Sequence, residues 1–566
     1  MLELPADFYY LVCEELANRQ DFGTLFNCAL SGKILVGPAL LWLYRIHNQW
    51  AVISSEGDDA DFTQSDTFQG RLNAQKKTLL NWALQWKSIT RSSLGNTAYP
   101  YCLWIRSLDL RNLTELLEDT RFRETALDTF FADDMSGFLK SQATPMKQKT
   151  RGAKAAYKRL DIPLVLELIG ESITSFISES ATQNRATVAV EDLSGNVSAN
   201  ALPKWVSRLS KLKSMTLWDG AALNASVASV IANDCYNFDD LTFFTCLRAD
   251  ADNDMAAFFG GLRAHTLRSF AALSAGSVGP HTLLSLNHHA HSLKKLKLDG
   301  LKSDAIKNLS YLQGCDQLES LELADAEGLI NLEATENDIY LEVVAWLSKC
   351  DSLRELLVSN LVSGPAILTQ VCLSNNIKLQ KLQVVSYPMI GNRDFHKALS
   401  HQASLESLEL RADPEGGFRD DIEDLVASIS QLSKLKYLNL LSTSDYFRTA
   451  ECLFLVESLS SLEELWFSGY DVTDELWHAM AKLHHLRALN IHAVTSFSYD
   501  GILAYISTLE STNQGMLLSV MNQSPEHPLS EFQEATIRQS IAAQADGRFE
   551  FTLFREIDSD AESFSD

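Results

Sequence analysis

A leucine pattern recurs along much of the chain. Leu267, Leu293 and Leu318, the first leucines of three neighbouring fragments, are 26 and 25 residues apart. Each fragment places two apolar residues two positions apart, so both lie on one face of a short strand while the residue between them faces the other way. The fragments are "LSKLKSMTL" from Leu209, "HTLRSFAAL" from His265, "HSLKKLKL" from His291, "DQLESLEL" from Asp316, "DSLRELLV" from Asp351, "IKLQKLQVV" from Ile377, "ASLESLEL" from Ala403, "SKLKYLNL" from Ser433, "SSLEELWF" from Ser460 and "HHLRALNI" from His484.

Between the predicted strands the pattern becomes helical. In "YDVTDELWHAMAKLHHL", which covers 470–486, Leu476, Met480 and Leu483 fall on one helical stripe. A single strand with a single helix cannot bury both apolar faces, so neighbouring units must stack. The spacing lies in the range of leucine-rich repeats, about 20–29 residues. The sequence therefore predicts an α/β leucine-rich-repeat solenoid, a horseshoe with a parallel inner sheet.

Two details resemble the cysteine-containing class of leucine-rich repeat. Cys315 in "GCDQL" and Cys350 in "KCDSL" stand three residues before a repeat leucine, and "DVTDELW" (471–477) is similar to the segment that opens the helix in that class. We expect these cysteines to be small buried hydrophobic residues. Longer steps, from Leu318 to Leu353 and from Leu405 to Leu435, predict insertions.

The first 46 residues form a compact apolar block. Phe8, Leu11, Val12 and Leu16 predict one face of a helix that starts after Pro5. Asp21 can cap a second helix, in which Phe22, Leu25, Phe26 and Ala29 share a face, and Gly32 can end it. A third apolar stretch, 39–46, is expected to begin at Gly37-Pro38. Three such helices expose more apolar surface than they can bury among themselves. Either the repeats behind them or another protein must cover it.

This block resembles an F-box, a motif found near the amino terminus of proteins that carry leucine-rich repeats behind it. "SGKILVG" (31–37) stands where the family has basic residues around a tryptophan. The resemblance implies that the block docks on a Skp-type adaptor, and through it on a cullin, in an SCF-type ubiquitin ligase. The alternative is that the block only caps the first apolar face of the solenoid. The expected adaptor-binding residues are Leu4, Pro5, Phe8, Leu11, Leu16, Leu25, Cys28, Leu40 and Trp42.

The repeats would then hold a protein substrate, whose identity the sequence does not give. Residues that flank the strand leucines point to the concave face and are the expected contacts. Trp466 is the foremost candidate, because tryptophan is enriched among the residues that dominate binding energy; packing under a neighbouring loop is its alternative role. The candidate substrate-binding residues are Trp218, Lys297, Asp299, Glu322, Glu409, Arg411, Trp466 and His492.

Charge and composition limit the kinds of partner and the cellular compartment that we expect. The formal charge of −25 disfavours nucleic acid, because phosphate backbones are repelled. Asp7, Glu14 and Glu15 interrupt the first apolar residues and so exclude a secretory signal, and no apolar run is long enough to predict a membrane span. Nine cysteines without CxxC spacing favour a reducing compartment, cytoplasmic or nuclear.

No catalytic motif stands out. The chain has no GxSxG, GxxxxGK[ST] or HExxH motif. His288 and His291 in "NHHAHSL" lack a carboxylate or thiol neighbour in sequence, so we expect a helical surface there rather than a metal site. We expect no cofactor, no metal and no enzymatic activity.

The expected organisation is a helical module (1–48), an acidic linker with a connecting helix (49–100), and irregular first repeats (101–200) that begin with "LWIRSLDL" and hold a basic loop at 143–159. That loop is expected to be solvated, with nuclear localisation as an alternative. Repeats at 201–545 and a final strand with a disordered acidic tail (546–566) follow. A repeat scaffold without a ubiquitin role, or a regulator of a small GTPase, are the alternative functions. The residues at 301, 326 and 361, where such regulators usually carry Asn, are Leu, Ala and Leu.

Overall fold

The computed structural model describes residues 5–49, 68–141, 160–184, 188–246, 248, 250–274, 276–413, 419–522 and 529–553. Four sequence predictions fall outside these ranges: Leu4, the acidic linker segment at 54–66, the basic loop at 143–159 and the acidic tail at 555–566. The chain divides into two compact units, residues 1–273 (unit 1) and 274–566 (unit 2).

The strands form one sheet of 15 in the order of the chain, and each strand pairing described is parallel. Unit 1 holds β1 Ser107–Asp109, β2 Asp192–Gly195, β3 Ser214–Asp219, β4 Asp240–Thr245 and β5 Ser269–Ala272. Unit 2 holds β6 Lys295–Leu301, β7 Ser320–Asp325, β8 Glu355–Ser359, β9 Lys381–Tyr387, β10 Ser407–Ala412, β11 Tyr437–Leu440, β12 Glu464–Val472, β13 Ala488–Thr495, β14 Leu517–Asn522 and β15 Arg548–Leu553.

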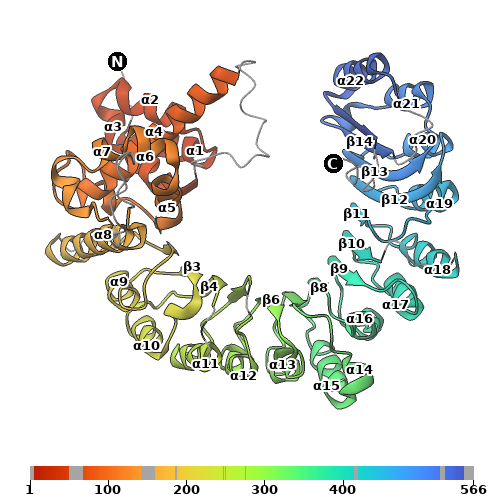
Figure 1. The fold of residues 1–566 in the computed structure, drawn as a ribbon, viewed down its shortest axis with the longest axis horizontal. Helices are drawn as coiled ribbons and strands as arrows, with labels where there is room; N and C mark the ends of the chain where they lie inside the picture. The colour runs from red at the N-terminus through yellow and green to blue at the C-terminus, as the bar shows by residue number, and fades with distance from the viewer. Residues whose placement is uncertain are drawn as a thin grey trace, which may run out of the picture. The chain divides into compact units, whose positions relative to one another are not determined.

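Helices connect the strands and cover one side of the sheet within each unit (Figure 1). Those of unit 1 are α1 Ala6–Asn18, α2 Phe22–Ser31, α3 Lys33–Arg45, α4 Phe68–Ser92, α5 Leu110–Glu118, α6 Thr120–Thr125, α7 Leu127–Phe130, α8 Ile162–Asn184, α9 Leu202–Arg208, α10 Ala225–Asp234 and α11 Ala251–Gly261. Those of unit 2 are α12 Pro280–Leu286, α13 Ser303–Ile306, α14 Leu332–Thr335, α15 Asn337–Leu347, α16 Gly364–Leu373, α17 Arg393–Ala398, α18 Arg419–Ile429, α19 Thr449–Ser458, α20 Glu475–Met480, α21 Tyr499–Ile506 and α22 Glu531–Ala545. Short 3-10 helices include η1 His47–Gln49 and η3 Tyr101–Leu103.

The leucine pattern forms the strands as predicted. In β7, Leu321 and Leu323 are buried, whereas Glu322 between them is only half-buried on the opposite face. Parallel register then places the leucines of successive repeats in rows, with Leu321 beside Leu356 of β8 and Leu296 of β6. Each row continues the apolar core from one repeat to the next. The predicted leucine-rich-repeat solenoid with a parallel inner sheet is confirmed.

A hydrogen bond from one repeat to the preceding one recurs three residues before the strand leucine. The buried Cys350 thiol donates to the carbonyl of Cys315, 3.8 Å away, and the Cys315 thiol donates to the carbonyl of Leu286. Gln402 is in the same position before Leu405, and its Nε2 donates to two carbonyls of the preceding repeat. The expectation that these cysteines are buried is confirmed. Most other repeats carry Leu or Ala at this position, for example Ala290, Leu432 and Leu459, so a side-chain donor is not required there.

Strands that depart from LxxLxL were missed by the sequence pattern. In β2 a single leucine, Leu193, is followed two residues later by Gly195, and in β4 the second apolar position is Phe243. In β14, Met516 takes the place of the first leucine. The long step from Leu318 to Leu353 contains the additional helix α14. All of these positions are buried, because shape and burial rather than leucine itself are required.

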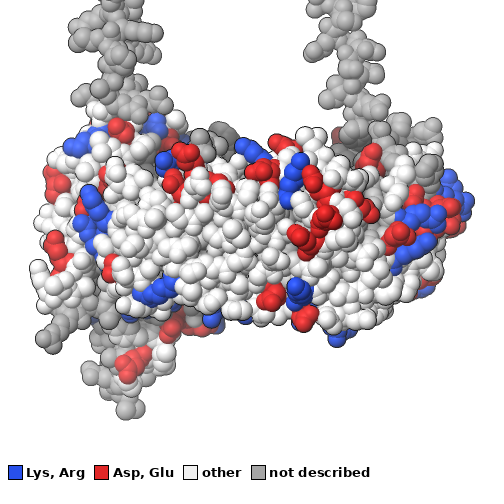
Figure 2. Space-filling model, turned by 90° about the horizontal axis from the view of Figure 1, so that it is seen from below, with Lys and Arg blue, Asp and Glu red and all other residues white. Residues whose placement is uncertain are grey.

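Surface charge is mixed on the face shown in Figure 2. Lys and Arg lie there in small groups beside Asp and Glu, separated by wide uncharged areas (Figure 2). An extended basic patch, which is the electrostatic footprint of a nucleic-acid interface, is not visible on this face.

Candidate functional site

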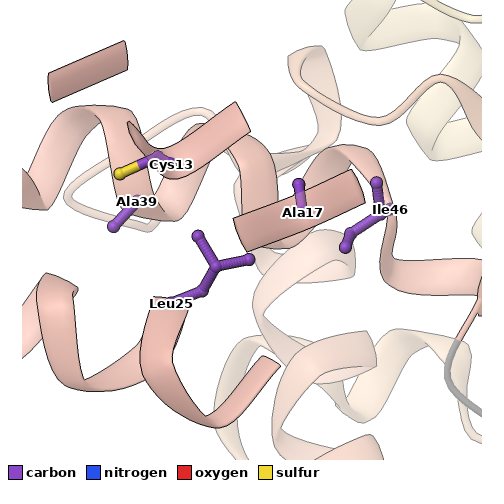
Figure 3. Packing of buried hydrophobic residues seen from close by; sticks show 5 residues of the cluster. All are labelled: Cys13, Ala17, Leu25, Ala39 and Ile46. Carbon is purple, nitrogen blue, oxygen red and sulfur yellow. The ribbon is translucent and has the colours of Figure 1, made fainter. Parts of the chain in front are cut away.

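The N-terminal module, residues 5–46, has a small core of its own. Cys13 and Ala17 of α1, Leu25 of α2, Ala39 of α3 and Ile46, which follows α3, converge there (Figure 3). Several predicted adaptor-binding residues belong to this core or its margin. Leu25 is fully buried, and Leu16, Cys28 and Trp42 pack against the cluster. Their role in the structure is to hold the three helices together. Leu40 is half-buried and Pro5 is exposed.

The helix boundaries follow local chemistry, with one correction. The Asp21 carboxylate accepts a hydrogen bond from the backbone N–H of Thr24 at 2.9 Å, as the predicted cap of α2, and Gly32 ends that helix. The third helix begins at Lys33 rather than at Gly37-Pro38, so Pro38 lies inside it. Gly32 has φ 179°, an extended conformation, and therefore already separates the two helices.

Several large apolar side chains of the module are exposed to solvent. Phe8 and Leu11 of α1, both predicted, are among them. Of the apolar residues predicted to share a face of α2, Leu25 and Phe22 belong to the core or pack against it, whereas Phe26 is exposed. We define the apolar docking face by five residues and their exposed fractions: Phe8 46%, Leu11 62%, Phe26 54%, Leu30 70% and Ile34 60%. Phe26, Leu30 and Ile34 could have been found by asking which apolar residues the core leaves over.

The end of α3 and the residues after it pack on η3 and α4 of unit 1. Tyr44 of α3 stacks on Tyr101 of η3, with ring centroids 4.3 Å apart. His47 is fully buried, its Nδ1–H donates to the carbonyl of Tyr44, and its ring meets Trp86 of α4 edge-on. Burial lowers the pKa of His47 to about 4. The module therefore packs on the rest of unit 1 through Tyr44 and His47, while the residues of the docking face stay exposed.

The second candidate surface is the side of strands β6–β15 that carries no helices, which we call the helix-free face (Figure 1). Several predicted substrate contacts lie on it but are already paired. Lys297 Nζ lies 2.5 Å from Glu322 Oε1 on the neighbouring strand, and Arg411 Nε lies 2.8 Å from Glu409 Oε1. Asp299 is half-buried where the register of β6 shifts.

The remaining predicted contacts lie in two places. Trp218 belongs to unit 1, where it is exposed and stacks on Phe244 at 5.1 Å between ring centroids. Trp466 and His492 lie on neighbouring strands β12 and β13 of unit 2, and both are half-buried. Burial lowers the pKa of His492. Sequence reasoning missed two neighbours of Trp466: Tyr437, whose ring centroid is 6.4 Å from that of Trp466, and Asn490, its register partner.

The described ranges can be assessed for metal-binding clusters and for reactive thiols. Within them no group of three or more His, Cys, Asp or Glu side chains is arranged to hold a metal ion. Burial raises the pKa of Cys315 and of Cys350 to about 12, which keeps both thiols protonated and poorly nucleophilic. The helices described include none with the length and apolar character needed to cross a membrane.

Comparison with known proteins does not assign the chain to a family. No protein-family model matches the sequence, and no curated protein matches it. Among solved structures, the complex of Rad7 and Elc1 in yeast is similar, with 14% identity, a TM-score of 0.38 and coverage of 64% of this chain and 92% of that chain. A TDR receptor matches with 12% identity, 68% and 66% coverage and a TM-score of 0.33. The TLR13–ssRNA13 complex matches with 12% identity, 65% and 54% coverage and a TM-score of 0.32.

Proposed function

We propose that the chain is the substrate-recognition subunit of an SCF-type cullin–RING ubiquitin ligase. In this proposal the N-terminal module docks on a Skp-type adaptor, and the repeats bind the protein to be modified. The observation that carries the proposal is the apolar docking face: five large apolar side chains remain exposed on three short helices whose other side is already packed. Exposed apolar patches of this kind mark protein-interaction sites.

The chain itself would perform no chemistry. Its contribution would be to raise the effective concentration of substrate lysines at the charged ubiquitin-conjugating enzyme. Such a ligase works in the cytoplasm or the nucleus, where we expect the chain. The capping role considered from sequence is compatible with this proposal, because Tyr44 packs on Tyr101 while the residues of the docking face remain exposed.

The test is co-purification of the full chain with a recombinant Skp-type adaptor. We expect a one-to-one complex with the wild-type chain. Leu11→Glu combined with Leu30→Glu places two charges in the docking face and should abolish the complex, while Leu329→Glu, which alters an equally exposed leucine in unit 2, should not. Failure of the wild-type chain to bind, or undiminished binding by the double variant, would refute the proposal.

A further inference from the structure

Four residues on strands β11 to β13 form a distinct patch on the helix-free face of unit 2. Tyr437 of β11 is the register partner of Glu464 of β12, and Trp466 of β12 is the register partner of Asn490 of β13. Their neighbours along the strands, such as Leu465 and Phe467, are buried in the core, so these four point to the other face. We call them the Trp466 patch.

The Trp466 patch has hydrogen-bonding capacity that the described residues leave unused. The indole N–H of Trp466 and the Oδ1 of Asn490 are both shielded from solvent and have no hydrogen-bond partner among those residues. Leaving such groups unpaired costs free energy that a bound partner recovers. Both residues are half-buried as a whole, so part of each side chain is accessible to a partner.

Glu464 is one of the carboxylates of this face that have no basic partner among the described residues. Glu322 and Glu409 are each neutralised by a basic side chain, whereas Glu464 has no Lys, Arg or His within 4.0 Å among the described residues. Burial raises the pKa of the Tyr437 hydroxyl, the hydrogen bond from Asn439 lowers it, the carboxylates of Glu409 and Glu464 raise it, and the guanidinium of Arg411 lowers it. Arg411 is paired with Glu409, which leaves the carboxylate of Glu464 as the charge near Tyr437 without a basic partner among the described residues.

A basic group complements this arrangement in both charge and shape. The described part of β11 to β14 carries no Lys or Arg on the helix-free face, and the chain as a whole has a charge of −25, which attracts cations. Aromatic rings bind Arg and Lys heads over their faces. A phosphorylated or acidic segment would instead meet Glu464 unscreened.

We propose that the Trp466 patch binds an Arg or Lys side chain in an extended segment of the substrate. Glu464 would hold the charged head, the rings of Tyr437 and Trp466 would contact its flat face or its stem, and Asn490 Oδ1 would accept one of its hydrogen bonds. The Trp466 indole N–H would donate to a main-chain carbonyl of the same segment. This inference rests on the proposed function in one respect, namely that the repeats hold a substrate.

The test uses fluorescein-labelled, end-capped peptides of Gly and Ser that differ at one central residue: Arg, Lys, Gln or phosphoserine. Fluorescence anisotropy with the full chain should give the Arg and Lys peptides at least about tenfold lower Kd than the Gln peptide, with the difference reduced by added salt. Phosphoserine should bind least. Equal affinity for Arg and Gln, stronger binding of phosphoserine, or no measurable binding of the Arg peptide would overturn the inference.

Variants locate the binding and separate it from adaptor docking. Glu464→Gln should remove the preference for Arg over Gln, and Trp466→Phe should weaken all peptides while preserving the order of their affinities. Glu355→Gln is the matched control, because Glu355 lies on the same face in β8 but accepts a hydrogen bond from Ser320. An unchanged Arg preference in Glu464→Gln would refute the site. All three variants should still co-purify with the adaptor, so loss of the adaptor complex alone would count against the proposed function and not against this patch.

Discussion

Gly170 offers a sharp test of the packing between the first repeats. It lies within α8, where replacement of a glycine by alanine ordinarily stabilises a helix by about 1 kcal/mol. Here a Cβ would lie 2.2 Å from the Cη2 atom of Trp205, whereas carbon atoms in contact are about 3.5–4.0 Å apart. The Trp205 side chain is fully buried, and its indole N–H donates to Glu171 at 3.0 Å. The ring therefore has to move by more than about 1 Å against a packed core.

Overpacking of this kind costs about 1–3 kcal/mol, and the clash places Gly170→Ala at the upper end. After the gain in helix propensity is subtracted, we expect a net loss of roughly 2 kcal/mol in the free energy of unfolding. Urea unfolding followed by circular dichroism would measure it. Gly260→Ala in α11 is the matched control, since nothing lies within 4 Å of its added Cβ, and it should be neutral or slightly stabilising.

A double-mutant cycle distinguishes the clash from other effects. Trp205→Phe removes part of the ring that meets the added methyl group, so Gly170→Ala should cost at least about 1 kcal/mol less in that background than in the wild-type chain. Wild-type stability for Gly170→Ala, or equal costs in the two backgrounds, would show that Trp205 does not occupy the space next to Gly170.

Three further outcomes follow from burial. Leu25→Ala should lower the unfolding free energy by about 2–5 kcal/mol, because it leaves a cavity. Leu30 is 70% exposed, so Leu30→Ala should hardly affect stability but should weaken adaptor binding by roughly 5- to 30-fold in a pull-down titration. The opposite pattern would show that Leu30 belongs to the core and Leu25 to the surface. His47 and His396 have a pKa of about 4 in the folded chain and about 6.5 in the unfolded chain, so the unfolded chain binds more protons as the pH falls. Lowering the pH from 7 to 5 should therefore reduce the unfolding free energy by about 2 kcal/mol for each site. A urea midpoint that does not fall over that range would contradict this. Gln402→Leu removes the donor to two buried carbonyls and should lower the unfolding free energy by at least about 2 kcal/mol, with thermal unfolding as the measurement and unchanged stability as the contrary result.

The repeat architecture could be predicted from sequence because it depends on a period-two apolar pattern that neighbouring repeats share. Strands such as β7 have leucine at both buried positions and were found. Strand β4 has Phe243 and strand β2 has Gly195 where the pattern expects leucine, so the leucine search missed both. A buried position requires a side chain that fits the space, which need not be leucine. The cap at Asp21 was found because its chemistry is local.

The docking face was only partly predictable for a geometric reason. An apolar residue on a short helix can face either the core or the partner, and sequence does not say which. Leu25 and Phe26 are adjacent and both apolar, yet one is fully buried and the other is exposed. The Trp466 patch depends on which residues lie side by side across strands that are far apart in sequence. Asn490 becomes its register partner only when β13 pairs with β12.

The contact between α3 and the repeats sets where the independent folding unit ends. Tyr44, Ile46 and His47 are all buried, and Tyr44 stacks on Tyr101, which lies beyond the predicted linker. A truncation after residue 48 would therefore remove part of the core of unit 1 along with the docking face, and the exposed remainder would be prone to aggregate. The module boundary predicted at residue 48 is therefore not suited to truncation. It is equally unsuited to a chimera in which one part is replaced by that of another protein. Grafting the module elsewhere would require its repeat-facing side to be rebuilt as well.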